Sequence, residues 1–298
     1  MSWRVIYIEE SDKLSLYLDN MKVIKNDEDI LIPISDIHTV ILDNYKINLS
    51  VHLINALTKA NVNLVICGID HLPKTIVIPY SGHKLSFSML QKQLDWDKTI
   101  KEVVHKFIVE NKIKNQKMLL KYFKKENYAI QILKKYQQEV TLADKTNREG
   151  LAAKCYFNAL FGSEFKRFNN DVINAGLNYG YAILRSQISK VLIAKGLNTS
   201  IGFFHIGREN EFNLSDDIIE PFRPLVDYWV HSNLLGVKMF LKEHRLALIK
   251  STTKKVKIDG KYQTLFNGIQ IFVEAILNFC ETRDEKTLRV VTIDYDEL

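Results

Sequence analysis

The spacing of apolar residues changes once along this chain, near residue 80, and this change constrains the fold most. Before it, apolar side chains alternate with other residues, which is typical of β-strands. After it, they recur every three or four residues, as in amphipathic helices. Pro79-Tyr80-Ser81-Gly82 is a turn or linker sequence between the two parts. The sequence therefore predicts an α+β protein, with a small β-rich domain over residues 1–80 and a larger all-α domain over residues 81–298.

The individual elements follow from the same patterns. Strands are predicted over 4–8, 14–18, 21–24, 30–34, 39–42, 62–67 and 76–78, with a short helix capped by Ser50. Helices are predicted near 85–96, 98–115, 116–141 (with a break), 147–161, 170–195, 221–242 and 263–281. The 12 Gly and 5 Pro among 298 residues are few, which favours long helices. Asp259-Gly260 indicates a hairpin or a mobile loop, and residues 288–293 form a strand or stay loose.

The formal charge of +6 is mild but unevenly distributed. Residues 1–75 carry 7 basic and 10 acidic side chains, and residues 149–243 carry 10 of each. Residues 98–148 carry 13 basic and 5 acidic side chains, and residues 244–258 carry 5 basic ones and no acid. Such basic stretches indicate a polyanionic partner, nucleic acid first. The alternative is lysine solvated on exposed helix faces.

Several classes of protein are excluded by what the sequence lacks. The first ten residues have no basic region before a long apolar core, and no apolar run approaches the roughly 20 residues of a membrane span. The 3 Cys are far apart and form no CxxC pair, so we expect a cytoplasmic protein with free thiols. No Walker loop, GxGxxG, GxSxG or HExxH sequence supports nucleotide hydrolysis, dinucleotide redox chemistry or a zinc peptidase.

Two residues are candidates for chemistry, each with a structural alternative. Glu149 lies three residues after Thr146, so its carboxylate could close a capping box at a helix start. His205 lies in an apolar run and could be a core histidine with satisfied hydrogen bonds. Neutral imidazole is also a common metal ligand, and Gly202 and Gly207 would let backbone or ligand approach closely.

A third candidate is the acidic stretch over residues 209–220. Asp217 and Glu220 share a face if that segment is helical, although acids before a helix could simply favour its macrodipole. Pro221 disfavours the αR conformation at Glu220 and would give its carboxylate a defined direction. Two or three carboxylates with one histidine suit Mg²⁺ or Mn²⁺ better than zinc. A divalent cation in a basic protein is what phosphodiester chemistry needs.

Three ordered sequence blocks resemble a known family. The first joins Asn147-Arg148-Glu149-Gly150 to the aromatic run at 156–162, and the second is the run from Ile173 to Tyr181. The third begins at His205 and continues through Phe212-Asn213-Leu214 to residues 216–227. Together they resemble the Cas-one family, the integrase subunit of CRISPR spacer acquisition, and most closely its type II branch.

This resemblance implies a fold, a site and a set of partners. It implies a β-rich domain, expected to be the dimerisation module, before a helical catalytic domain, and a homodimer of which two copies are bridged by a Cas-two dimer. Its divalent-metal ligands fall on Glu149, His205 and Glu220, and Asp217 occupies a second acidic position used in some branches. The implied reaction is transesterification, in which the 3′-hydroxyl of a short double-stranded protospacer DNA attacks a phosphodiester at the edge of a CRISPR repeat.

Other functions and residues remain open at this stage. A structure-selective nuclease on branched DNA would use the same metal site, and a DNA-binding scaffold would have an inactive one. Arg148 and Arg223 are candidate phosphate contacts because they lie close in sequence to the proposed ligands. Arg148 could instead be a surface group at the helix start, and Arg223 an internal ion-pair partner.

Overall fold

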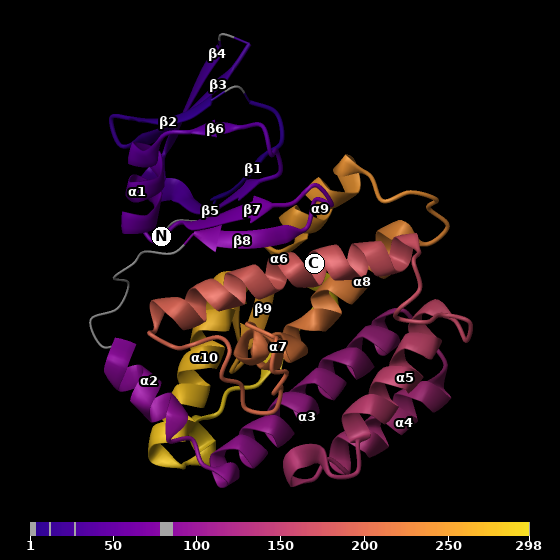
Figure 1. The fold of residues 1–298 in the computed structure, drawn as a ribbon. Helices are drawn as coiled ribbons and strands as arrows, with labels where there is room; N and C mark the ends of the chain where they lie inside the picture. Colours follow the sequence, from indigo (N-terminus) through magenta and orange to yellow (C-terminus); the bar gives the residue numbers. More distant parts are fainter. Residues whose placement is uncertain (1–3, 12, 27, 78–85, 298) are drawn as a thin grey trace. The chain divides into compact units, whose positions relative to one another are not determined.

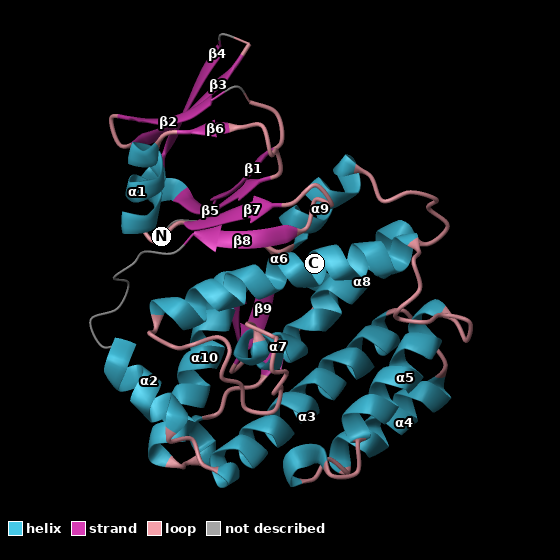
Figure 2. Ribbon diagram, in the orientation of Figure 1, coloured by secondary structure: helices cyan, strands magenta, loops and turns pink. Residues whose placement is uncertain are grey.

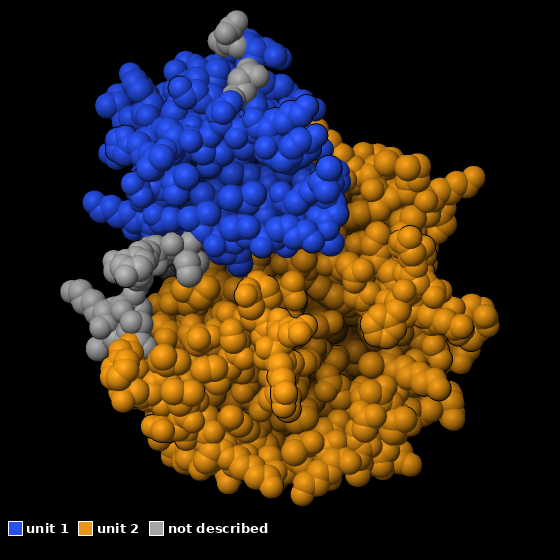
Figure 3. Space-filling model, viewed as in Figure 1, with its two compact units in different colours: residues 1–84 blue, residues 85–298 orange. Residues whose placement is uncertain are grey.

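The chain forms two compact units, residues 1–84 and 85–298 (Figure 3). The computed structural model describes residues 4–11, 13–26, 28–77 and 86–297. The expected joint at Pro79-Tyr80-Ser81-Gly82 lies outside the described residues, so the boundary at residue 80 stays a prediction. The predicted fold class is confirmed, because the first unit is built on β-sheets and the second is mostly helical.

The first unit contains two four-stranded sheets. One has the order β1-β5-β7-β8, in which β8 alone is antiparallel to its neighbour, and the other has the order β4-β3-β2-β6. The strands are β1 (Arg4–Ile8), β2 (Lys13–Tyr17), β3 (Asn20–Lys25), β4 (Glu28–Pro33), β5 (Ile37–Leu42), β6 (Asn48–Leu49), β7 (Asn63–Cys67) and β8 (Pro73–Val77), with the turn η1 (Ile34–Asp36).

Helix α1 (Val51–Lys59) begins as predicted, because the Ser50 hydroxyl accepts a hydrogen bond from the Leu53 amide at 3.2 Å. This bond satisfies one of the amides that a helix start leaves without a partner. The helix packs on β2 and β7, and Leu53 and Leu57 join the buried core together with Leu14. The alternating pattern of the strands thus becomes one apolar core beside α1.

The second unit is built around helix α3. Its elements are α2 (Ser86–Leu94), α3 (Lys98–Tyr122), α4 (Asn127–Gln138), η2 (Leu142–Asp144), α5 (Arg148–Phe161), α6 (Val172–Ala194), α7 (Asn213–Ile219), η3 (Glu220–Phe222), α8 (Arg223–Leu234), α9 (Lys242–Ser251), β9 (Lys255–Ile258), β10 (Lys261–Thr264), α10 (Leu265–Thr282), η4 (Glu285–Thr287), β11 (Val291–Thr292) and η5 (Tyr295–Glu297). Helix α3 packs against α4, α5, α7 and α8 and against the turns η2 and η3 (Figures 1 and 2). Of the helices within the described ranges, none combines the length and apolar content that a bilayer-spanning segment needs.

Three details of this unit differ from the sequence patterns. Helix α3 continues to Tyr122, so the break falls at 123–126 rather than at 115. The single helix expected over 221–242 ends at Leu234, because Gly236 has a φ of +78°, and α9 follows as a separate helix. The domain is also not purely helical, since β10, β9 and β11 form a small antiparallel sheet. Asp259-Gly260 forms the turn of the β9–β10 hairpin, so the hairpin rather than the mobile loop is the correct alternative.

The last strand is held by side chains of α3. Asn111 donates from Nδ2 to the Val291 carbonyl at 2.6 Å and accepts the Val291 amide at 2.9 Å. Asn115 contacts the same carbonyl at 3.2 Å. Because these amides are buried, each bond replaces one that water cannot supply. The strand β11 is therefore fixed to the central helix as well as to β9.

Two glycines let α6 approach α8 closely. A Cβ at Gly176 would overlap the side chain of Leu234, and a Cβ at Gly180 would overlap that of Val226. Both glycines are buried within α6, and glycine is intrinsically unfavourable inside a helix. Their presence is explained by the close packing of α8, the helix that directly follows Glu220.

We expect Gly180→Ala to lower the free energy of unfolding by about 1–3 kcal/mol, because the added methyl group must displace Val226. Helix propensity alone predicts the opposite sign, a gain of about 1 kcal/mol. Urea denaturation of the two proteins measures the difference. A more stable Gly180→Ala variant would show that α6 and α8 are not packed this closely.

Candidate functional site

Three elements of the second unit meet at the ammonium group of Lys112. This residue lies on α3, and its Nζ is 2.6 Å from Oε1 of Glu149 on α5 and 2.5 Å from Oε2 of Glu220 on η3. The side chains of Lys112 and Glu220 are only 11% and 4% exposed. The structure thus brings two of the predicted carboxylates to one cationic side chain. Lys112 itself was not among the residues predicted from the sequence.

The charges of this group stabilise one another. Burial disfavours the charged form of Lys112, but the carboxylates of Glu220 and Glu149 outweigh it and raise the pKa of the ammonium. Burial likewise opposes ionisation of Glu149, yet Lys112 and His105 lower the pKa of its carboxyl well below the usual value. The site is therefore ion-paired at neutral pH.

Glu149 does not close a capping box, so that alternative is wrong. Helix α5 is capped by Asn147, whose side chain accepts the Gly150 amide at 3.2 Å. Asp144 accepts the amides of Arg148 and Glu149, each at 2.8 Å. Because these two side chains satisfy the first amides of the helix, the Glu149 carboxylate is available for Lys112.

Glu220 keeps a helical conformation despite the proline that follows it. Its φ and ψ of −52° and −46° are in the αR region, so the expectation drawn from Pro221 is wrong. Pro221 lies at the start of η3, where a missing amide is tolerated, and α7, η3 and α8 continue one another. Asn115 of α3 donates to the Pro221 carbonyl at 2.8 Å and fixes this turn. Arg223 binds the second oxygen of Glu220, Oε1, at 3.1 Å.

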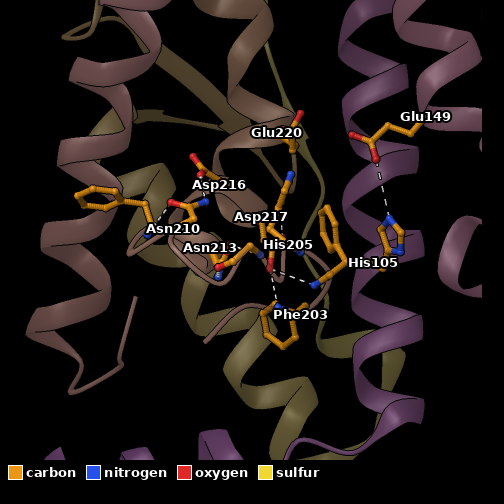
Figure 4. A network of polar contacts seen from close by, with 12 residues as sticks. His105, Glu149, Phe203, His205, Asn210, Asn213, Asp216, Asp217 and Glu220 are labelled. Atoms are coloured by element: carbon orange, nitrogen blue, oxygen red, sulfur yellow. Dashed lines mark hydrogen bonds and ion pairs between the residues drawn. The ribbon is translucent and has the colours of Figure 1, made fainter. Parts of the chain in front are cut away.

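His205 is held by the carboxylate of Asp217. Asp217 accepts the ring Nδ1 of His205 at 2.6 Å and its backbone amide at 3.0 Å (Figure 4). The same carboxylate accepts the amides of Phe203 at 2.5 Å and Phe204 at 3.3 Å. Because Nδ1 faces Asp217, the other ring nitrogen, Nε2, faces away from it. The His205 side chain is 38% exposed, so it is not the core histidine that the sequence left open.

The loop that carries His205 depends on Gly202. A Cβ at this position would lie 2.5 Å from the His205 carbonyl oxygen and 2.8 Å from Oδ2 of Asp217. A side chain there would push the loop away from Asp217. The sequence suggested that glycine lets backbone or ligand approach closely here. At Gly202 it is the backbone that approaches, and it meets the carboxylate of Asp217.

His105 of α3 connects the two halves of the site and was missed by the sequence reasoning. Its Nε2 lies 3.8 Å from Oε2 of Glu149 (Figure 4). Its ring stacks on Phe204, with centroids 4.0 Å apart. A cavity of about 340 Å³ opens beside this stack and is also lined by Lys98 and Lys101. His105 therefore links the α5 acid to the loop of His205.

The two candidate DNA-contacting arginines are both engaged inside the protein. Arg148 lies 3.1 Å from Oε2 of Glu139, and its guanidinium lies over the ring of Tyr136. Arg223 binds Glu220 and lies over the ring of Tyr181. Arg223 is thus the internal ion-pair partner that its alternative described, whereas Arg148 is ion-paired rather than a lone surface group. Contact of either arginine with DNA stays a prediction.

A further hydrogen-bonded group lies behind Arg223. Asp227 accepts the hydroxyl groups of Tyr181 and, at 2.7 Å, Tyr156, and all three side chains are buried. Burial raises the pKa of Asp227 to about 6. This group supports the ring on which Arg223 lies and so holds the partner of Glu220 in place.

The donor chemistry of the site fits a hard divalent cation. Glu149 and Glu220 already direct one oxygen each at the same positive charge, and carboxylate oxygen is the donor that Mg²⁺ and Mn²⁺ prefer. A histidine whose Nδ1 is held by a carboxylate is the usual state of a metal-binding imidazole. Within the described ranges, however, no three His, Cys, Asp or Glu side chains form a ready metal-binding group.

Comparison with known proteins identifies the same family as the three sequence blocks. Residues 6–257 match the family described as CRISPR associated protein Cas1, so the chain belongs to this family and the expected resemblance is confirmed. It is 31% identical over 299 residues to a CRISPR-associated endonuclease Cas1 of Neisseria meningitidis, with 98% of this chain and 97% of the relative covered.

Solved structures share the fold. A casposase bound to integration product has a TM-score of 0.74 and 20% identity over 96% of this chain and 92% of its own. A chain of a Cas6-RT-Cas1–Cas2 complex has a TM-score of 0.72 and 17% identity over 96% of this chain and 36% of its own. The family match and the Neisseria relative support a role in CRISPR adaptation as a nuclease.

We expect Asp217→Asn to lower the pKa of His205. Burial disfavours the imidazolium, but the hydrogen bond and charge of Asp217 outweigh this and raise the pKa above the usual 6.5. A raised folded-state pKa stabilises the protein below pH 6.5, and this stabilisation is lost as the pH rises through the folded-state value. NMR titration of the ring protons measures the shift. Asp216→Asn removes a nearby acid that does not bind the ring, and an equal shift there would contradict the role of Asp217.

Proposed function

We propose that this protein is a divalent-metal-dependent DNA integrase of CRISPR adaptation. It joins the 3′-hydroxyl ends of short protospacer DNA to the CRISPR repeat by transesterification, with Mg²⁺ or Mn²⁺. The observation that carries the proposal is the convergence of Glu149 and Glu220 on one cationic position in a chain that matches its Neisseria relative over nearly its whole length. The free thiols of Cys155 and Cys280 agree with work in the reducing cytoplasm.

In this proposal Glu149, His205 and Glu220 hold the cation. A divalent cation held there would neutralise the scissile phosphate and favour charge on the attacking and leaving oxygens. Asp217, the weaker candidate ligand, accepts four hydrogen bonds from its own chain, which supports a role in orienting His205. In the reaction the 3′-oxygen bonds to phosphorus, the repeat's own P–O3′ bond breaks, and the released oxygen takes a proton.

The partners follow from the same proposal. They are double-stranded DNA, a second copy of this chain, and a Cas-two dimer that bridges two such homodimers. The fold is shared with a chain of a Cas6-RT-Cas1–Cas2 complex and with a casposase bound to integration product, which supports Cas-two and DNA as partners. Arg148 and Arg223 are proposed DNA contacts that would have to leave Glu139 and Glu220.

The integration reaction tests the metal ligands. With its Cas-two partner, a 3′-hydroxyl duplex and a supercoiled plasmid carrying the repeat, the protein should join DNA in Mg²⁺ or Mn²⁺. Glu149→Gln, His205→Ala and Glu220→Gln should each reduce joining by about 100-fold or more, because each removes a ligand of the cation. The matched control is Glu209→Gln, which removes an exposed acid from the same stretch as Glu220.

Other outcomes identify the alternative functions. Cleavage of branched DNA without joining indicates a structure-selective nuclease that uses the same site. Binding of DNA with neither joining nor cleavage indicates a scaffold. If the three variants join DNA as well as the wild type, the ligand assignment is wrong.

The proposed dimerisation module has an apolar edge that can be tested. Strand β4 lies at the edge of its sheet, with Ile30 and Leu31 exposed by 54% and 47%. An apolar edge strand favours pairing with another chain. We expect Ile30→Lys to shift the protein from dimer to monomer in sedimentation experiments. Val51→Lys changes an apolar position on α1 that is exposed by 72%, and it should leave the dimer intact. Equal behaviour of the two variants would exclude this edge.

A further inference from the structure

Lys112 differs from the other lysines of its helix. Lys114 donates to the hydroxyl of Thr292 at 2.8 Å, and Lys117 donates to the amide oxygen of Gln137 at 2.6 Å. Lys112 instead binds two carboxylates and is the more buried, with 11% of its side chain exposed. It therefore balances two negative charges that come from different elements.

The oxygens that Lys112 binds are the ones that a divalent cation needs. Arg223 binds Oε1 of Glu220, so Oε2 is the oxygen directed at Lys112. On Glu149, Oε1 faces Lys112, whereas His105 lies near Oε2. An ammonium group and a divalent cation cannot share these two oxygens at close range, because the two positive charges repel each other.

We propose that Lys112 is an internal counter-cation, which holds Glu149 and Glu220 together and is exchanged for the divalent cation when the metal binds. This inference rests on the metal site of the proposed function. Without a positive charge between them, the two carboxylates would repel each other. With Lys112 they stay aligned, and the flexible stem of lysine lets the ammonium move away when the metal takes its oxygens.

This role predicts the opposite effect on metal binding from a purely structural ion pair. If Lys112 only stabilised the fold, its loss would loosen both acids and weaken metal binding. If it competes with the metal, its loss leaves the acids without a cation and strengthens metal binding. Metal affinity therefore separates the two roles without any measurement of DNA joining.

The experiment is Mn²⁺ titration of the purified full-length protein by calorimetry, without DNA. We expect Lys112→Met, which keeps the stem and removes the charge, to bind Mn²⁺ about tenfold more tightly than wild type. Lys112→Arg keeps the charge and should stay near the wild-type affinity. Lys114→Met removes a charge from the same helix away from the acids and should leave the affinity unchanged.

Thermal denaturation gives a second readout of the exchange. In the presence of a chelator, Lys112→Met should unfold at a lower temperature than wild type, because the two acids face each other unpaired. Saturating Mn²⁺ should raise the unfolding temperature of Lys112→Met more than that of wild type, since tighter binding gives a larger stabilisation. If Lys112→Met cannot be obtained folded, Lys112→Met/Glu149→Gln relieves the repulsion and should fold, which supports charge balance between the acids. A double variant that also fails to fold contradicts it.

The results separate this inference from the proposed function. If wild type binds Mn²⁺ and Lys112→Met binds it equally or more weakly, the exchange is overturned and the metal site stands. If wild type and Lys112→Met both bind no better than Glu149→Gln, the metal site fails, and the exchange fails with it. Binding by Lys112→Met alone supports the exchange in its strongest form.

Discussion

The buried ion pairs of Lys112 are the contact on which the candidate site depends. A charge removed from water is unfavourable unless it is paired, and Lys112 is paired with both acids at once. Lys112 comes from α3, Glu149 from α5 and Glu220 from η3, so the three segments must be placed together. The same contact therefore stabilises the fold of the second unit and brings the two proposed ligands to one point.

Helix α3 acts through a polar stripe on its buried face. Asn111, Lys112, Asn115 and Gln116 are all buried, at spacings that place them on one side of a helix. Lys112 binds the acids, whereas Asn115 fixes the carbonyl of Pro221 directly after Glu220. The ion pair of Lys112 with Glu220 and the hydrogen bond of Asn115 to Pro221 thus hold the same turn, η3, in place. A site held on a helix in this way is placed more rigidly than one held by loops alone.

Local patterns predicted most of the elements, and partners distant in sequence decided the rest. Most strands of the first unit and the cap at Ser50 follow from short stretches of sequence, whereas the ligand roles of Glu149 and His205 stay predictions. The predicted conformation of Glu220 was wrong, because η3 accommodates Pro221 at its start. Lys112 was missed because counting charge treats every lysine as solvated. The available signal was the repeat of a polar pair, Asn111-Lys112 and Asn115-Gln116, at helical spacing, which indicates a polar stripe on one helix face.

The hold of α3 on β11 also orders the events of synthesis. Glu149, His205 and Glu220 all precede β11 in the chain, and a ribosome makes them first. Until Val291 follows, Asn111 and Asn115 lack the backbone partner that they bind in the folded protein. Buried amides without partners are unfavourable, so the central helix reaches its final environment only after the last strand is made. The acids can therefore be synthesised long before their surroundings are complete, which delays a working site until nearly the whole second unit has left the ribosome.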